Sequence, residues 1–453
     1  MFKKFFTYPV FLVLFLSFIG SLLFGYSIKY YAEGGKKYLY LRDIVFFIAE
    51  TPKPIINMIR SKSLNPNKPP LLTKHKDKKR FEKFIENKRN ALLVLPRYDH
   101  ILSRSVVDIV DLNNFQTIHT YKHDIEEMNN QIVNVEEYLR FKNNISPIRF
   151  RYFHPLLFSD GTLINSDNNS YAFKIDFCSN MIWINDKEVF HHSKMLDHEG
   201  NIWITGKMYP YSKLINKYAT KDNRKFFEND SLIKIDINGK IIFNKSVTEI
   251  LIRNNILPNN FVLNSLLSKQ FDPIHLNDIE PALDNTKYWK KGDVFISLRE
   301  QSSIVHYRPS NDEVINYITG PFVEQHDVDI ISDKEISILN NNNFFINNEH
   351  SEVVVYNFET KKFRKLFNNQ LQKENFKTYR GGLHKILKDG SLMVDEQAHG
   401  RIILFNNRGE KEWEFVNKDK NGDIANIWWS RIIEDEIFIE QFKSLLQNKK
   451  CLN

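Results

Sequence analysis

Hydrophobic positions follow two patterns along the chain. Residues 5–28 form a single uncharged, predominantly apolar run, whereas from about Ala91 onward short runs of β-branched and aromatic residues alternate with turns of the Asp-Gly and Asn-Gly type. An apolar helix of about 20 residues crosses a bilayer, and short apolar runs bounded by such turns are typical of β-strands. The pattern therefore predicts one N-terminal membrane helix and an all-β body.

The strand runs of the body recur at intervals of roughly 40 residues, which is the period of a propeller blade. Each unit opens with a polar residue and continues as strand, turn and strand, as in HPLLFSDGTLINS from His154 and LHKILKDGSLMVDE from Leu383. We count six units: 91–124, 154–186, 191–250, 275–320, 325–370 and 379–417. The expected fold class is all-β, a six-bladed β-propeller preceded by one transmembrane helix and a basic linker. A β-sandwich is the alternative architecture.

The charges that flank the apolar run do not settle its topology. Lys3 and Lys4 precede the run, and a larger set follows it: Lys29, Lys36, Lys37 and Arg42. Taken alone, this excess would place the body in the cytoplasm. The run is longer than the apolar region of a usual signal peptide, about 7 to 15 residues. We therefore expect an uncleaved anchor, with cleavage at Gly25-Tyr26-Ser27 as the alternative.

Four parts are predicted along the chain: a transmembrane anchor or uncleaved signal (1–30), a juxtamembrane helix and basic linker (31–90), the propeller (91–440) and a C-terminal tail (441–453). Residues 53–89 hold twelve Lys and Arg against three acids, a surplus of nine, whereas the whole chain has a net charge of +8. The body is therefore close to neutral, which argues against a nucleic-acid-binding domain. The linker charge is that of a solvated spacer near anionic headgroups.

The cysteines and tryptophans have structural interpretations. Cys178 falls in the middle of a predicted strand and Cys451 near the C-terminal end, so we expect no disulfide framework and see no evident pair. The tryptophans are interpreted as packing residues between strands, because propeller strands repeat aromatics for packing; they are Trp183, Trp203, Trp413 and the pair Trp428-Trp429.

Five of the 14 histidines open a predicted unit: His154, His192, His275, His326 and His384. The first strand of each propeller blade lines the central channel, so these side chains are expected to converge at one end of one axis. Arg299, in VFISLREQSSIVHY, and Asn277, two residues after His275, join them. A spacing of two residues places His275 and Asn277 on the same face of a strand.

Several chemistries are disfavoured by the motifs around these histidines. His191-His192 with His198 lacks the helical pair and the cysteine partners of zinc sites, so we expect no metal and no cofactor. The chain has no Gly-x-Ser-x-Gly elbow and no phosphate-binding Gly-rich loop. Imidazoles, a guanidinium and an amide suit a tetrahedral oxyanion, sulfuryl or phosphoryl, with one neutral imidazole as nucleophile. Arg299 would keep that imidazole neutral.

At these residues the sequence resembles the bacterial arylsulfotransferase family, which moves a sulfuryl group between phenols without a nucleotide donor. FDPIHLNDIEPA (271–282) resembles its His-x-Asn motif, GDVFISLREQSSIVHY (292–307) the strand with its arginine, and EQHDVDII (324–331) the strand with its nucleophilic histidine. FHHSKML (190–196) resembles an earlier histidine motif. The resemblance covers about residues 150–430, with the four motifs in the family's order.

The resemblance implies a sulfotransferase that uses an aryl sulfate donor and a phenolic acceptor. It assigns His326 as the transiently sulfated nucleophile, and the sulfuryl oxygens to His192, His275, Asn277 and Arg299. It also implies export, so the body is expected in the periplasm, tethered to the inner membrane by one helix. The oligomeric state stays open, a homodimer included.

Two other functions remain open from the residues alone. One is a non-catalytic, membrane-tethered propeller that binds an anionic or glycan ligand or a protein partner, because fold does not fix function. The other is a hydrolase or lyase that uses the same ring of histidines, with water as the acceptor in the hydrolase. Acceptor dependence of product release would separate transfer from hydrolysis.

Overall fold

The computed structural model describes residues 8–32, 41, 45, 72–86, 89–133, 150–218, 228–256, 272–343 and 349–451. The chain forms two compact units, Met1–Pro70 and Leu71–Asn453. Apart from positions 41 and 45, the predicted juxtamembrane helix lies outside the described residues.

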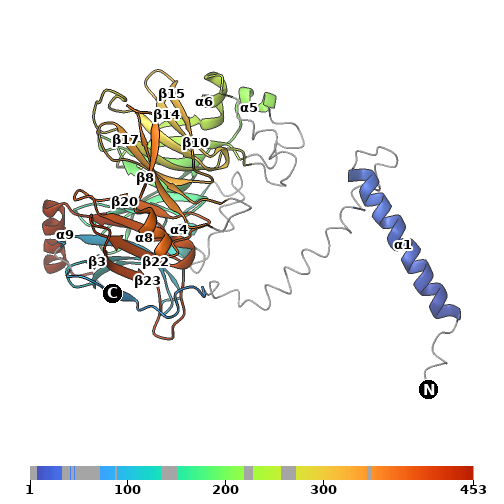
Figure 1. Ribbon diagram of the computed structural model, residues 1–453, viewed down its shortest axis with the longest axis horizontal. Coiled ribbons are helices and arrows are strands. Elements are labelled where there is room, and N and C mark those ends of the chain that lie inside the picture. The colour runs from blue at the N-terminus through green and yellow to red at the C-terminus, as the bar shows by residue number, and fades with distance from the viewer. Residues whose placement is uncertain are drawn as a thin grey trace. The chain divides into compact units, whose positions relative to one another are not determined.

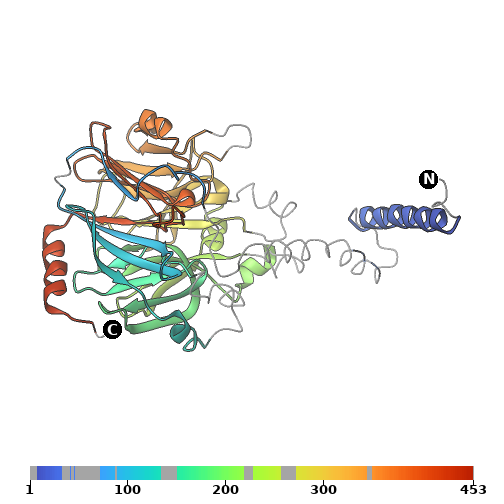
Figure 2. The ribbon, with the colours of Figure 1, turned by 90° about the horizontal axis from the view of Figure 1, so that it is seen from below.

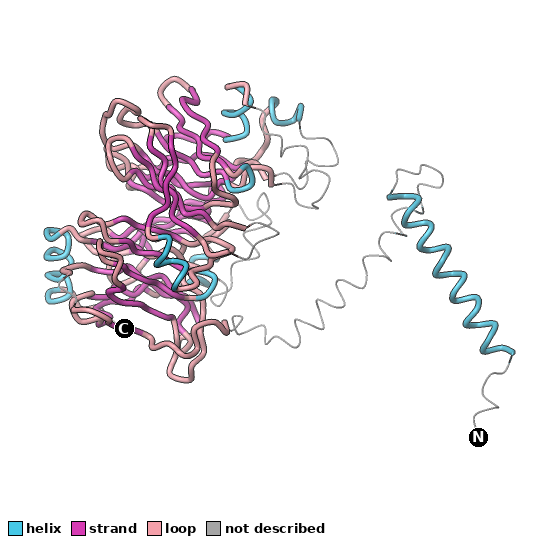
Figure 3. Tube along the Cα trace, viewed as in Figure 1, coloured by secondary structure: helices cyan, strands magenta, loops and turns pink. Residues whose placement is uncertain are grey.

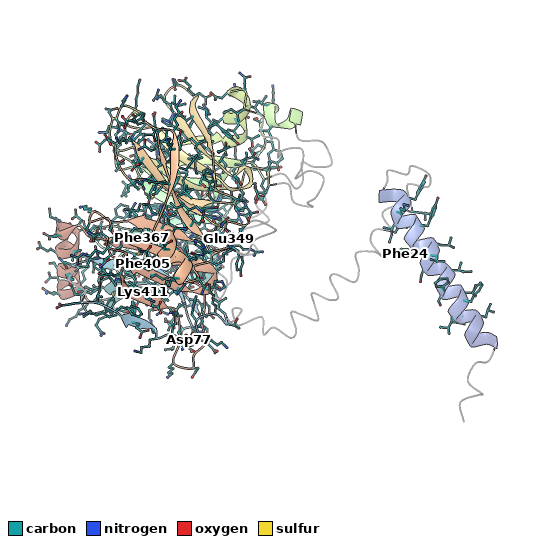
Figure 4. The ribbon with its side chains drawn as sticks, in the orientation of Figure 1. Phe24, Asp77, Glu349, Phe367, Phe405 and Lys411 are labelled. Atoms are coloured by element: carbon teal, nitrogen blue, oxygen red, sulfur yellow. A yellow bond between two sulfur atoms is a disulfide. The ribbon has the colours of Figure 1, made fainter. Side chains whose placement is uncertain are left out.

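The smaller unit contains the apolar helix α1, Tyr8–Ala32. Its segment Leu12–Tyr30, 19 residues with a mean hydropathy of 1.8, is long and apolar enough to cross a membrane, and none of it is buried. Side chains project from every side of this helix, Phe24 among them (Figure 4). A helix that is apolar all round is not the amphipathic helix of a protein surface. The expected N-terminal apolar helix is confirmed, and its properties fit a membrane anchor and a signal sequence alike.

The larger unit is built from five antiparallel sheets, whose strands are coloured magenta in Figure 3. The first sheet consists, in spatial order, of β24 (Arg431–Ile433), β2 (Leu92–Asp99), β3 (Arg104–Asp111) and β4 (Gln116–Tyr121). The second consists of β5 (Leu156–Leu157), β6 (Leu163–Ser166), β7 (Ser170–Ile175), β8 (Met181–Leu196), β9 (Ile202–Lys207), β10 (Asp230–Ile235) and β11 (Ile241–Ser246).

The other three sheets follow in chain order. The third consists of β12 (Leu276–Pro281), β13 (Val294–Leu298), β14 (Ser303–Arg308) and β15 (Glu313–Thr319). The fourth consists of β16 (His326–Ile330), β17 (Glu335–Asn340), β18 (Glu352–Asn357) and β19 (Lys362–Leu366). The fifth consists of β20 (Leu383–Ile386), β21 (Leu392–Glu396), β22 (Arg401–Phe405), β23 (Lys411–Val416) and β1 (Phe81–Lys83).

The first strands of the third, fourth and fifth sheets lie against one another, β12 against β16 and β16 against β20, and β12 also lies against β8 of the second sheet. In Figure 1, strands of the second to fourth sheets, among them β10, β14 and β17, lie in the upper part of the larger unit, and β3, β22 and β23 of the first and fifth sheets lie in its lower part. This all-β arrangement is propeller-like, as the repeats predict. It places the residues that open each predicted unit at the ends of neighbouring inner strands.

The count of six blades is wrong. Four of the sheets have the four or five strands of a blade, but predicted units 154–186 and 191–250 share one seven-stranded sheet. The reason is β8, whose 16 residues run from one unit into the next. It pairs with β7 between Met181 and Phe190 and with β9 between Val189 and Leu196. The hydrophobic pattern shows where strands occur, and it does not show that one strand serves two units.

The segments before β2 and after β23 tie the first and last sheets together. β1 pairs with β23 in the fifth sheet, and β24 pairs with β2 in the first. The larger unit therefore includes residues 72–86, 89 and 90, which the sequence analysis assigned to the linker. Helix α9, Glu436–Asn448, follows β24, and it extends into the predicted tail.

Cys178 and Cys451 form a disulfide, which corrects the expectation that no cysteine pair is present. The bridge joins positions 273 residues apart. It fastens the end of α9 to the turn between β7 and β8, and Figure 2 shows α9 as the red helix along one side of the unit. Nothing in the sequence indicated this pair, because the two cysteines lie far apart along the chain and come together only when it folds.

Short helices connect several strands: α4 (Ile125–Asn129), α5 (Lys213–Tyr218), α6 (Val247–Arg253) and α8 (Asn368–Lys373), with the 3-10 helices η2 (Arg299–Gln301) and η3 (Gln397–His399). Helix α6 begins at Ser246, whose side chain accepts a hydrogen bond from the backbone N–H of Glu249 at 3.2 Å. This is the usual way to satisfy a free donor at a helix start.

Apolar side chains fill the space between neighbouring sheets. Phe367, between β19 and α8, and Phe405 of β22 pack with ring centroids 6.2 Å apart (Figure 4). Trp203, Trp413 and Trp429 are among the largest fully buried side chains. Their burial agrees with the packing role that the sequence suggests for tryptophan.

Candidate functional site

The predicted site residues lie where inner strands carry irregularities. The strand registers shift between His191 and Lys194, between Leu276 and Asp278, and between His326 and Val328. Such bulges redirect side chains and occur next to active sites. The bulge in β12 also interrupts the alternation on which the same-face prediction for His275 and Asn277 depended.

Several backbones at this end of the inner strands are left-handed. His192 has φ 41°, His275 φ 49° and Asp327 φ 52°. Residues other than glycine adopt this region at a cost of about 1–3 kcal/mol, and such strain concentrates at functional sites. The same conformation at His154, with φ 48°, shows that the irregularity recurs from one inner strand to the next.

The structure brings three of the predicted histidines together. The ring of His192 lies 5.6 Å from that of His275 and 6.4 Å from that of His326, measured between centroids. Trp429 packs against two of them, with its ring centroid 6.1 Å from that of His192 and 6.2 Å from that of His326. The sequence assigned Trp429 to packing, and it is fully buried, but the side chains it packs against are those of the site.

The proton of His326 is positioned by an amide. Nδ1 of His326 lies 2.8 Å from Oδ1 of Asn341. The Asn341 nitrogen donates to the carbonyl oxygens of Thr378, at 2.8 Å, and Gly381, at 2.9 Å. Because both hydrogens of the amide are used, its oxygen must face His326 as an acceptor, and Nδ1 must carry the ring proton. Nε2 therefore holds the lone pair, which accepts the Gly381 N–H at 3.2 Å.

His326 is neutral over the ordinary pH range. Burial, followed by the charge of Arg299, lowers the pKa of His326 to about 3. The Asn341 contact acts in the opposite direction and is outweighed. A buried, neutral imidazole with an unprotonated Nε2 is in the state that a histidine nucleophile requires.

His275 has the opposite protonation preference. Its Nδ1 lies 2.7 Å from the Asp272 carboxylate. Burial lowers the pKa of His275, but the charge and hydrogen bond of Asp272 outweigh burial and Arg299, and the pKa is raised overall. The same pairing lowers the pKa of Asp272 against the effect of its own burial. The site therefore contains one neutral imidazole, His326, and one readily protonated imidazole, His275, each in ring contact with His192.

His192 is held by its neighbour in sequence. Nδ1 of His192 lies 2.8 Å from Nδ1 of His191, whose Nε2 faces the Gly206 carbonyl oxygen at 3.2 Å. Burial lowers the pKa of both rings, that of His192 well below its ordinary value. With both rings neutral, His191 donates to Gly206 and accepts from His192. Nε2 of His192 then carries no proton.

Arg299 and Asn277 are engaged by protein groups. The backbone N–H of Arg299 donates to the His275 carbonyl oxygen at 3.1 Å. Its guanidinium pairs with Glu300 and, at 2.7 Å, with Glu324. Asn277 donates to the carbonyl oxygen of Gln325, the residue before His326, at 2.8 Å. Among the described residues, Oδ1 of Asn277 has no hydrogen-bond partner.

Two predicted channel histidines lie beside this group and not within it. His154 packs on Trp429 at 5.4 Å, and burial lowers its pKa well below the ordinary value. His384 contacts Asp327 and Ser337 and lines a cavity of about 220 Å³ together with His154.

Sequence reasoning missed several site residues. Asn341 and Asp272 set the protonation of His326 and His275, while Asp327 and Asp329 face the cavity with His384. Their signal in the sequence is weak: Asn341 belongs to a run of asparagines that is typical of a loop. Asp327 and Asp329 were within a quoted motif, HDVD, but had no role assigned.

An all-β, propeller-like body with histidines gathered at the ends of its inner strands defines the class of protein. The chain belongs to the arylsulfotransferase family: the model of the family Arylsulfotransferase (ASST) matches residues 154–418. All five predicted site residues lie within this span. The resemblance inferred from the motifs is thereby confirmed.

Comparisons with other proteins add little beyond the family. The chain is similar to a protein of unknown function from Bacteroides caccae at 10% identity, covering 77% of this chain and 100% of that chain with a TM-score of 0.47. It is similar to virginiamycin B lyase from Staphylococcus aureus at 10% identity, with a TM-score of 0.36. The match covers 74% of this chain and 87% of that chain. No curated protein matches this chain.

Proposed function

We propose that the protein transfers a sulfuryl group from an aryl sulfate to a phenolic acceptor through a sulfated His326. The observation that carries the proposal is the protonation state of His326, with its proton fixed on Nδ1 by Asn341 and its lone pair on Nε2. Family membership supports sulfotransferase chemistry. The readily protonated His275 beside a neutral nucleophile supports a mechanism that needs an acid and a nucleophile at once.

In the first step, Nε2 of His326 gives up its hydrogen bond from the Gly381 N–H and uses the freed lone pair to attack the sulfur of the bound aryl sulfate. The S–N bond forms while the bond from sulfur to the aryl oxygen breaks. The departing phenolate takes the Nε2 proton of the His275 imidazolium, whose Nδ1 stays on Asp272. Sulfation makes the His326 ring cationic, and the Asn341 oxygen stabilises that charge by accepting the Nδ1 proton in a stronger hydrogen bond.

In the second step, the oxygen of an acceptor phenol attacks the sulfur and its proton passes to neutral His275. The S–N bond breaks, and its electron pair returns to Nε2 of His326. Both steps use the same acid and base in reverse order, so the enzyme is restored without a cofactor.

The remaining residues bind and position. Arg299 offers its guanidinium to the sulfuryl oxygens. These oxygens compete for it with the carboxylates of Glu300 and Glu324. Asn277 offers the second hydrogen of its amide nitrogen while the first holds the backbone next to His326. His192, with an unprotonated Nε2, is better suited to accept a hydrogen bond from the phenol hydroxyl than to bind sulfuryl oxygens.

We also propose that the larger unit works outside the cytoplasm, on the periplasmic side of the inner membrane, and that α1 is its single membrane anchor. The Cys178–Cys451 disulfide supports this placement, because such bonds persist in oxidising compartments and are rare in the cytosol.

The test is intact-mass analysis of the full chain in detergent after brief exposure to a chromogenic aryl sulfate. A mass increase of one SO3 group is expected, and addition of a phenol should discharge it with release of the sulfated phenol. His326→Ala should abolish the adduct. His350→Ala serves as the control, because His350 contacts Asn368 at 2.9 Å and takes no part in the site. An adduct that persists in His326→Ala removes the histidine from its role. Release of one equivalent of aryl product without phenol is part of the first step, whereas repeated turnover without phenol would indicate a hydrolase.

A further inference from the structure

A second cluster of charged side chains lies on β16, the strand of the proposed nucleophile, and on the neighbouring strand β20. Asp327 and Asp329 of β16 and His384 of β20 are all buried, and one potential ligand atom from each lies within 4.8 Å of the others. All three line the cavity of about 220 Å³. The group is separate from His192, His275 and Arg299, which do not line that cavity.

The contacts within this cluster leave acceptors unsatisfied. Nδ1 of His384 lies 2.6 Å from Oδ2 of Asp327 but lacks the alignment of a hydrogen bond. Asp329 is 4% exposed, and its Oδ1 meets Lys385 Nζ at 2.8 Å. Its Oδ2 has no hydrogen-bond partner among the described residues. A buried carboxylate oxygen without a partner costs free energy unless something binds it.

The charge around the cavity favours a cation. Its lining includes four carboxyl groups and two groups of permanent positive charge, with two histidines: Asp278, Glu280, Asp327, Asp329, Lys385, Arg431, His154 and His384. The carboxyl groups therefore exceed the positive charges available to them.

We propose that Asp327, Asp329 and His384 bind one divalent transition-metal ion, such as Zn²⁺ or Mn²⁺. One imidazole nitrogen with carboxylate oxygens suits these ions, whereas Ca²⁺ and Mg²⁺ prefer oxygen alone. Nε2 of His384 contacts the Ser337 hydroxyl at 2.7 Å, which is the type of outer contact that orients a metal-binding histidine. The cavity leaves space for water to complete the coordination.

Such an ion would join the fourth and fifth sheets close to His326, through residues of β16 and β20. Asp327 follows His326 in the chain and has a left-handed backbone, with φ 52°. Its Oδ2 also accepts the backbone N–H of His384 at 2.7 Å. Coordination would hold this strained residue, and with it the start of β16, against β20. This binding site goes beyond sulfuryl transfer and does not depend on it.

The experiment is a Co²⁺ titration of the EDTA-treated full chain without an affinity tag, followed by visible absorption. One equivalent with d–d absorption is expected, displaced by Zn²⁺. Asp329→Asn should lose this binding, while Asp333→Asn, in the exposed turn that follows β16, should retain it. If the wild type binds no stoichiometric Co²⁺, the proposal is overturned, and a doubly protonated His384 is then the partner of Asp327. If Asp329→Asn binds Co²⁺ as well as the wild type does, the proposal is also overturned.

X-ray absorption of the Zn²⁺-loaded wild type gives a result that does not depend on any variant folding. One imidazole and oxygen ligands are expected. A shell with two or more imidazoles would overturn the assignment, because it would require His154 as a further ligand or an ion among His192, His275 and His326.

Discussion

Asn341→Asp should make catalysis sensitive to acid. The substitution keeps an oxygen 2.8 Å from Nδ1 of His326 but gives it a full negative charge, which favours the imidazolium. A protonated His326 has no lone pair on Nε2 and cannot attack sulfur. Activity should therefore be lost as the pH falls through the new pKa of His326.

The magnitude follows from a comparison within the same site. His275 is also buried and near Arg299, yet Asp272 at 2.7 Å raises its pKa above the ordinary 6.5. An equivalent carboxylate beside His326 should raise its pKa from about 3 to that range. The change corresponds to roughly 5 kcal/mol in favour of the charged ring, and it should lower kcat/KM at pH 5.5 by about tenfold or more relative to pH 8.

The assay is the pH dependence of kcat/KM for a chromogenic aryl sulfate between about pH 5 and 8.5. In the wild type, protonation of His326 should cause no loss of kcat/KM as the pH falls through this range. Asn342→Asp adds the same charge one residue along, where the amide donates to the His350 carbonyl oxygen at 3.1 Å, and should behave as wild type. A flat acid limb in Asn341→Asp, or the same decline in Asn342→Asp, would refute the role of Asn341.

Three further predictions concern other residues. Asp272→Asn removes the carboxylate that raises the pKa of His275, so the decline of kcat/KM at high pH, where His275 loses its proton, should move to lower pH in the same assay. Gly381→Ala should introduce about 1–3 kcal/mol of strain, because Gly381 has φ 58° and an added Cβ would meet the Gln397 side chain. Both the melting temperature and kcat should fall as a result. Unchanged values would contradict the close approach of Gln397 to Gly381. Cys451→Ser should lower the free energy of unfolding by about 2–5 kcal/mol in urea titrations, with reductant having that effect on wild type alone.

The sequence predicted the elements and the main site residues, because strand periodicity and motif order are local signals. The ring of His192 does lie close to those of His275 and His326, at 5.6 and 6.4 Å between centroids. The strand pattern could not show that β8 runs through two units, since strand length depends on pairing with both neighbours. The sheet count was therefore wrong, although nearly every strand region was found.

The residues that control protonation were beyond sequence reasoning for a different reason. Asn341 lies 15 positions after His326, and its orientation depends on two carbonyl groups that belong to a third segment. Asp272 is near His275 in sequence, but its contact depends on a turn that no motif encodes. The Cys178–Cys451 pair likewise exists only once α9 lies on the second sheet. Contacts of this kind are set by tertiary packing.

The exchange of strands between the first and last sheets has a consequence for the order of assembly. The second, third and fourth sheets use only strands from continuous stretches of chain, so each can form as soon as its own stretch is available. The first sheet must wait for β24, and the fifth must retain β1, whose Glu82 pairs with Glu414 of β23 much later in the chain. Until both arrive, β2 and β23 present open edges, which invite pairing with other chains. Recombinant fragments that begin after β1 or end before β24 should therefore aggregate during expression. They should do so even though they contain His192, His275 and His326.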